Sequence, residues 1–169
     1  MVEKMKKNSG FTLIELIVAV ALFAIVIGPL FQAFSSSIKA NSRARSVLKA
    51  TQLATSVMDN VERFSAKELR EDMTLSDFGA KLLPNGISHV ASSKTVNGDN
   101  VEIQFKNVAY QDLKVNIKIT VTKNSENSGN KYHVYTADVF VHMNKGVSDS
   151  NSFSNDPLAH IRGSVQNIE

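Results

Sequence analysis

The feature that most constrains this chain is a long uncharged apolar run near its N-terminus. Leu16 to Ile38 contains no Asp, Glu, Lys or Arg over 23 positions. As a helix with a rise of about 1.5 Å per residue, the run extends roughly 34 Å, enough to cross a hydrocarbon core of about 30 Å. The run therefore predicts a membrane-spanning helix.

One carboxylate lies inside the apolar segment. Glu15 follows the start of that segment at Phe11, and the span contains no cation that could pair with it. A charged side chain at the centre of a bilayer costs about 2.5–3.5 kcal/mol, and less near an edge. We expect the missing cation to come from another copy of the chain or from a sister protein. The alternative is an acid that reaches the membrane interface of a plain anchor.

The residues around Glu15 resemble a known family. The sequence Lys-Lys-Asn-Ser-Gly-Phe-Thr-Leu-Ile-Glu at positions 6–15 is similar to the N-terminus of a type IV prepilin or type II secretion pseudopilin. The resemblance combines a short basic leader, a glycine, a phenylalanine, a glutamate four residues later and a long apolar helix. It covers about the first quarter of the chain.

The resemblance implies how the chain is processed and with what it assembles. A prepilin peptidase would cut between Gly10 and Phe11 and N-methylate Phe11, and Glu15 would pair with the N-terminal amine of a neighbouring subunit. The implied partners are the peptidase, other pilin or pseudopilin subunits, an inner assembly platform protein and the cytoplasmic membrane. The implied location is the cytoplasmic membrane before assembly and an extracellular filament at the cell surface afterwards.

Two other interpretations of the N-terminus remain open. A secretory signal peptide also has a basic start and an apolar core, and Ala33-Phe34-Ser35 resembles its cleavage site. A plain transmembrane anchor is the second. Cations flank the span on both sides: Lys4, Lys6 and Lys7 precede it, and Lys39, Arg43, Arg45 and Lys49 follow it. We expect the N-terminus inside, because long domains translocate largely regardless of charge and the family does so.

Beyond the span, the pattern predicts a helix that continues to about residue 65 and becomes amphipathic. Apolar residues recur at spacings of three and four: Val47, Ala50, Ala54, Val57, Val61 and Phe64. Gly28 and Pro29 predict a kink within the apolar half, because proline cannot donate to the carbonyl four residues earlier. The cations of residues 39–49 indicate either a solvated face or a contact with anionic headgroups or with acids of neighbouring subunits.

The second half of the chain predicts an antiparallel sheet. Apolar and polar residues alternate over 101–106, 113–122 and 135–143, which is typical of strands covered on one side. A weaker strand is predicted over Ile87–Val90. Turns are expected at 97–100 and 124–130, and Thr74 is expected to cap a short helix through Lys81 that ends at Pro84-Asn85-Gly86.

The tail from Asn144 is rich in Ser and Asn and resembles a loop, part of it disordered. Four apolar residues predict a last segment docked on the sheet, as helix or strand: Leu158, Ile161, Val165 and Ile168.

The sequence offers no catalytic constellation and predicts no cofactor. The histidines at 89, 133, 142 and 160 have no zinc-type spacing, and we expect them at the surface or in turns. Asp149, Asn151 and Asp156 could suggest calcium, but their spacing does not fit an EF-hand loop. The chain has no Cys and a net charge of +3, which falls to +1 without residues 1–10. That near balance argues against a dedicated nucleic-acid surface.

We therefore predict a pilin-like α+β fold: a leader (1–10), a transmembrane or filament-core helix (11–38), an amphipathic helix half (39–65) and a globular antiparallel-sheet head (66–169). The favoured function is a structural subunit, a minor pilin, and not an enzyme. The alternatives are a pseudopilin of a secretion or DNA-uptake system and a membrane-tethered extracellular binding module that does not polymerise.

Overall fold

The computed structural model describes residues 12–124, 133–144, 153 and 156–167. The chain forms two compact units, Met1–Arg43 and Ala44–Glu169. We call the second unit the head. One helix, α1 (Leu13–Val61), passes from the first unit into the head. The fold is α+β and pilin-like, with this long N-terminal helix followed by a five-stranded antiparallel sheet.

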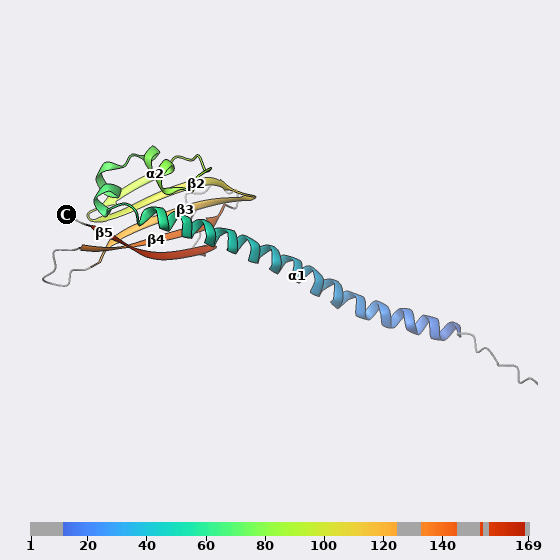
Figure 1. Ribbon diagram of the computed structural model, residues 1–169. Coiled ribbons are helices and arrows are strands. Elements are labelled where there is room, and N and C mark those ends of the chain that lie inside the picture. The colour runs from blue at the N-terminus through green and yellow to red at the C-terminus, as the bar shows by residue number, and fades with distance from the viewer. Residues whose placement is uncertain (1–11, 125–132, 145–152, 154–155, 168–169) are drawn as a thin grey trace, which may run out of the picture. The chain divides into compact units, whose positions relative to one another are not determined.

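The head sheet is a meander in which each strand pairs with the next one along the chain (Figure 1). Its strands are β1 (Ser93–Asn97), β2 (Asn100–Tyr110), β3 (Leu113–Lys123), β4 (His133–Met143) and β5 (Ala159–Asn167). Every pair is antiparallel. The three predicted strands are confirmed as β2, β3 and β4.

Alternation of side chains decides which face of the sheet is buried. In β3, Val115, Ile117, Ile119 and Val121 are buried, and the register places Ile119 beside Ile103 of β2 and Val139 of β4. Successive side chains point to opposite faces of a strand, so the apolar residues of all three strands lie on one face. That face requires a cover.

The C-terminal part of α1 supplies the cover. Within the head, α1 lies along one face of the sheet (Figure 1), and its buried residues belong to the same core as the strands' apolar residues. The buried residues of α1 are Ala50, Leu53, Ala54, Val57, Met58 and Val61. Four of them belong to the predicted stripe, while Val47 remains 37% exposed and Phe64 is half-buried. The structure thus widens the stripe by adding Leu53 and Met58.

The connection between α1 and the sheet is held by capping contacts. It contains a π-helix, η1 (Glu68–Asp72), and a short helix, α2 (Leu75–Leu82). Thr74 caps α2 in a reciprocal capping box with Asp77, as predicted, and the turn at Asn85-Gly86 is closed by a bond from Ile87 N to Pro84 O (3.2 Å). Backbone and side-chain hydrogen bonds from Ser65 lower the pKa of Glu68.

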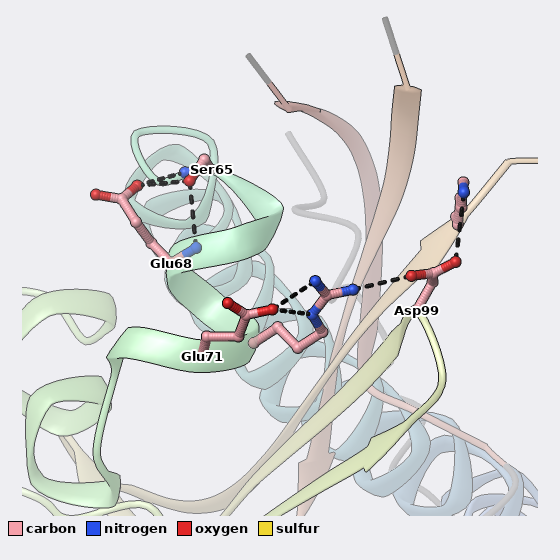
Figure 2. Close-up of polar contacts among 6 residues, drawn as sticks. Ser65, Glu68, Glu71 and Asp99 are labelled. Carbon is pink, nitrogen blue, oxygen red and sulfur yellow. Dashed lines mark hydrogen bonds and ion pairs between the residues drawn. The ribbon is translucent and has the colours of Figure 1, made fainter. Parts of the chain in front are cut away.

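Ion pairs tie η1 to the β1–β2 turn. Arg70 contacts Glu71 at 2.6 Å and Oδ1 of Asp99 at 2.8 Å, and Lys123 of β3 lies 3.4 Å from the other carboxylate oxygen of Asp99. Figure 2 shows Glu71 and Asp99 in these contacts. Gly98, the first central residue of this turn, has a φ of +62°. Glycine takes that conformation without the steric cost that a side chain would add.

The prediction of a strand at Ile87–Val90 is wrong. This segment packs along α2 and forms no strand. Ala91 N donates to Leu75 O (3.1 Å) at the start of α2. A Cβ added at Gly79 of α2 would lie 1.6 Å from the carbonyl oxygen of His89. Only glycine at position 79 allows the two backbones to approach so closely. The strand in this region is β1, which begins at Ser93.

The tail is not wholly a loop, because residues 159–167 form β5 along β4. Ala159 and Val165 are buried, and Leu158 and Ile161 are partly buried against the core. Ile168, Asp149 and Asn151, together with the disorder expected for the tail before β5, lie outside the described residues, as do 125–130 of the expected 124–130 loop.

We predict that a fragment beginning at Asn41 folds as a soluble head and that Val57→Asp destabilises it by several kcal/mol. Val57 is fully buried in the seam between α1 and the sheet, where an unpaired carboxylate has neither water nor a partner. Thermal melting monitored by circular dichroism measures the effect. Gln52→Asp, which places the same residue at an exposed position of the same helix, is the control and should melt within a few degrees of wild type. Equal melting temperatures for Val57→Asp and wild type would contradict the docking.

Candidate assembly site

The predicted cleavage and methylation residues, Gly10 and Phe11, lie outside the described residues. The first described residue is Thr12, and α1 begins at Leu13. Glu15 is in the first turn of α1, where a carboxylate interacts favourably with the partial positive charge of the helix N-terminus. Its role in subunit assembly stays a prediction.

Thr12 caps the helix beside Glu15. The backbone N–H of Glu15 donates to the Thr12 carbonyl at 3.1 Å and approaches its Oγ1 at 3.4 Å, while the N–H of Leu16 donates to the same carbonyl at 3.3 Å. The bond from Leu16 is the first regular hydrogen bond of the helix, and the threonine also occupies the N–H of Glu15, which the first turn would otherwise leave unpaired. This cap fixes the backbone at the start of the helix, including that of Glu15.

The apolar half of α1 is exposed along its whole length within the single chain. Residues 12–44 are all classed as exposed, including Leu22, Phe31 and Ile38. Among the described residues, α1 is the one helix whose length and composition suffice to cross a membrane. Apolar surface on this scale is typical of a segment that contacts a membrane or another protein.

The helix continues without interruption through Gly28 and Pro29. A Cβ added at Gly28 would meet nothing within 4 Å, so close packing does not explain the glycine. The predicted kink at these two residues stays a prediction.

Among the cations that follow the span, Lys49 has a partner in the head. Its Nζ forms an ion pair with Oδ1 of Asp112, which lies between β2 and β3, and this hydrogen bond from Lys49 lowers the pKa of Asp112. Sequence reasoning did not find this pair, because 63 positions separate the two residues. Arg45 is exposed on the same helix.

The described residues contain no group of three or more His, Cys, Asp or Glu side chains that could hold a metal ion. His160 is exposed and His89 half-buried, whereas His142 is buried, which corrects the expectation of a surface or turn residue. The reason is local: the rings of His142 and Phe153 meet edge-on with centroids 5.5 Å apart, and the ring of Phe140 stacks near His142 at 6.4 Å. The side chain of His133 lies outside the described residues.

A polar cluster on β4 and β5 was not predicted. Asp138 accepts from Nε of Arg162 at 2.8 Å and lies 2.7 Å from Nε2 of His160, whose ring stacks on Phe140 at 4.3 Å. Burial acts to raise the pKa of Asp138, but the hydrogen bonds from Arg162 and His160 outweigh it and lower the pKa. The cluster joins the neighbouring strands β4 and β5. The sequence did not predict it, because Asp138 lies far along the chain from Arg162 and His160.

Together these features define a class: an α+β protein whose head carries a long, exposed, apolar N-terminal helix with one carboxylate in its first turn. The chain matches the family of the prokaryotic N-terminal methylation motif over residues 5–31. It therefore carries the type IV pilin signature, and its architecture is pilin-like. Neither the curated proteins nor the solved structures contain a match to this chain. The motif and the apolar helix fit membrane anchoring and a surface filament.

We predict that Asp138→Asn lowers the melting temperature of the head at neutral pH and not in acid. The folded-state pKa of Asp138 is depressed, so its ion pairs contribute stability above the ordinary aspartate pKa of about 3.9 and lose it as pH falls through the folded-state value. Arg162 is largely exposed, so solvent screens the pair and the expected difference in melting temperature is no more than a few degrees.

The measurement is the melting temperature of both proteins between pH 7 and pH 2. The two curves should converge at the acid end, where the wild-type carboxyl is protonated. A difference that is the same at every pH would contradict the assignment.

Proposed function

We propose that this protein is a structural subunit, a minor pilin, of a type IV pilus-like filament. The observation that carries the proposal is the methylation motif at residues 5–31 directly before an exposed apolar helix with Glu15 in its first turn. Prepilin peptidase cuts after Gly10 and methylates Phe11. Residues 1–10 are then a leader, 11–38 the membrane and filament-core helix, 39–65 its amphipathic continuation and 66–169 the main part of the globular head.

Cleavage creates the cation that Glu15 lacks. The new α-amine of Phe11 has an ordinary pKa of about 7.7–8.0 and is largely protonated at neutral pH. In an apolar medium an unpaired charge is very unfavourable, whereas a hydrogen-bonded pair of opposite charges offsets much of that cost. A subunit in the membrane therefore gains by placing its amine beside Glu15 of a neighbour, which fixes the axial register of the two helices.

Before assembly the apolar helix holds the subunit in the cytoplasmic membrane with its N-terminus inside. An assembly platform protein in the same membrane and other pilin subunits are the partners of this stage. The head, which shares one core between helix and sheet, does not require the filament in order to fold. No step of this function requires catalysis or a cofactor.

A pseudopilin of a secretion or competence system shares the motif and the apolar helix, so the same residues would act in the same way. A tethered binding module that never polymerises is the alternative from another class. Glu15 favours assembly over a tether, because a tether has no use for a carboxylate within its apolar segment.

We predict that Gly10→Val blocks processing. Glycine has no side chain, which allows close approach of the backbone in a peptidase cleft. Electrophoresis of membrane fractions should show the unprocessed precursor for Gly10→Val and the shorter chain for wild type. Ser9→Val, one residue earlier in the leader, is the matched control and should be processed. Normal cleavage of Gly10→Val would contradict the assigned cut site.

We also predict that Glu15→Val leaves cleavage and membrane insertion intact but lowers the amount in sheared filaments more than about ten-fold. The expected loss is large because the neighbour's amine is left unpaired in an apolar medium, at a cost of several kcal/mol. Immunoblots of the sheared and membrane fractions measure it. Gln32→Val, which replaces another polar residue of the same span, should assemble normally. Equal filament amounts for Glu15→Val and wild type would remove the assembly role of Glu15.

A further inference from the structure

The end of the head at which α1 enters is rich in cations. α1 enters the head at Ala44, and the ion pair between Lys49 and Asp112 holds the tip of the β2–β3 hairpin beside this part of the helix. Figure 1 shows the tip at this end of the head. Two segments far apart in the sequence, residues 44–50 and 106–116, therefore meet here, and we call them the basic end.

The basic end has an excess of positive charge. Its charged residues are Arg45, Lys49, Lys106, Lys114 and Asp112. Asp112 is already paired with Lys49. Within the part of the chain that the structure describes, no carboxylate lies within ion-pair distance of the other three cations. Arg45 and Lys114 are exposed and Lys106 is half-buried, so these three positive charges are available to a partner.

The opposite end of the sheet has the reverse balance. There, η1 contains three acids and one cation, Arg70, and Asp99 lies in the adjoining turn between β1 and β2. The cations that pair with these acids are Arg70 and Lys123. Between the two ends, β2 extends about 33 Å. A negatively charged surface would thus attract the basic end and repel the other, so charge alone gives the head a preferred orientation.

The hairpin in the basic end has an unusual and well-supported backbone. Among the described residues other than glycine, Asn107 and Gln111 are the ones with a positive φ, at +60° and +54°. The register of β2 and β3 shifts between Phe105 and Val108, which is a β-bulge at the base of the hairpin end. The N–H of Asn107 donates to Oδ1 of the buried Asn116 at 2.9 Å. Such conformations persist where the surrounding structure holds them, and they are concentrated at functional sites.

The basic end is also close in sequence to the apolar run. Arg45 follows Ile38 by seven positions, or about 10 Å along a helix. The apolar segment that begins at Phe11 would extend about 42 Å as a helix, which exceeds the hydrocarbon core of about 30 Å. A segment longer than the core is accommodated by tilting or kinking. Tilting brings the positions just beyond the segment closer to the lipid headgroups.

We propose that the basic end binds the anionic phosphate headgroups of the membrane that holds the apolar helix, through Arg45, Lys106 and Lys114. This inference rests on the membrane-anchored stage of the proposed function. Each Lys or Arg near an anionic surface adds to the attraction, which falls off within about 10 Å at 0.1 M salt. The contact holds the head of an unassembled subunit in one orientation. It is lost when the subunit enters the filament, because the lipid stays behind.

Fluorescence quenching in vesicles tests the contact with the full chain, which contains no natural Cys. Ala109→Cys places a thiol at an exposed position of the hairpin opposite Lys114, and Asn97→Cys places one at an exposed position of the far end. Each variant is reconstituted in vesicles of phosphatidylcholine, with or without phosphatidylglycerol. The thiol is then labelled from outside with an impermeant dye, and a headgroup-labelled lipid is the quencher.

Phosphatidylglycerol should raise the quenching at position 109 several-fold, because the anionic headgroups draw the basic end to the surface. The quenching at position 97 should change little. High salt should remove the increase at position 109, because it screens exposed charges.

Neutral variants in the Ala109→Cys background identify the cations responsible. Lys106→Gln with Lys114→Gln should lower the quenching in phosphatidylglycerol vesicles to the value in phosphatidylcholine, whereas arginine at both positions should retain it. Arg63→Gln with Lys67→Gln removes two positive charges from exposed positions outside the basic end. This variant is the matched control and should be quenched like the unaltered chain.

The outcomes separate this inference from the proposed function. Equal quenching at position 109 in the two kinds of vesicle would overturn the contact and leave the filament function intact, because assembly is measured in sheared filaments. Quenching that is unchanged by Lys106→Gln with Lys114→Gln would also overturn it. Release of the full chain from vesicles by a carbonate wash would overturn the membrane-anchored stage of the proposed function, and the contact with it.

Discussion

One continuous helix has to satisfy two unlike surroundings, and the rest of the structure depends on that constraint. The first part of α1 exposes apolar residues on every side and has no cover of its own. The last part, from Ala50 to Val61, buries one side in the core of the head. The sheet must therefore be apolar on the face that meets the helix. Without cysteines, packing and the surrounding polar contacts must hold the head together.

Side-chain alternation made most of the sheet predictable, and its exceptions have physical causes. β2, β3 and β4 alternate cleanly because one face is buried throughout. β1 escaped prediction because it is short, polar and at the edge, with Val96 as its one large apolar residue. In β5 the alternation is interrupted by Gly163, where a Cβ would lie 2.3 Å from Oε1 of Glu62 and 2.8 Å from Sδ of Met58. Because Met58 of α1 and Glu62 lie so close, this position has no room for a side chain, and the strand pattern lacks the apolar residue that would have indicated it.

The candidate site was predictable where it depends on local sequence and not where it depends on the fold. Glu15 is conspicuous in the sequence because the transfer of a carboxylate from water into an apolar segment is unfavourable. The Lys49–Asp112 pair depends on how the helix docks on the sheet, and the Asp138 cluster depends on strand register. Neither can be predicted from residue patterns along the chain. The burial of His142 likewise depends on Phe153, a residue of the connection between β4 and β5.

The central claim is that the chain becomes a filament subunit once cleavage before Phe11 has created an amine for Glu15. Intact-mass analysis of the wild-type protein from the sheared filament fraction tests this claim most directly. The account predicts a chain that begins at Phe11 and carries one added methyl group. A chain that begins at Ser36, or one that retains residues 1–10, would contradict it.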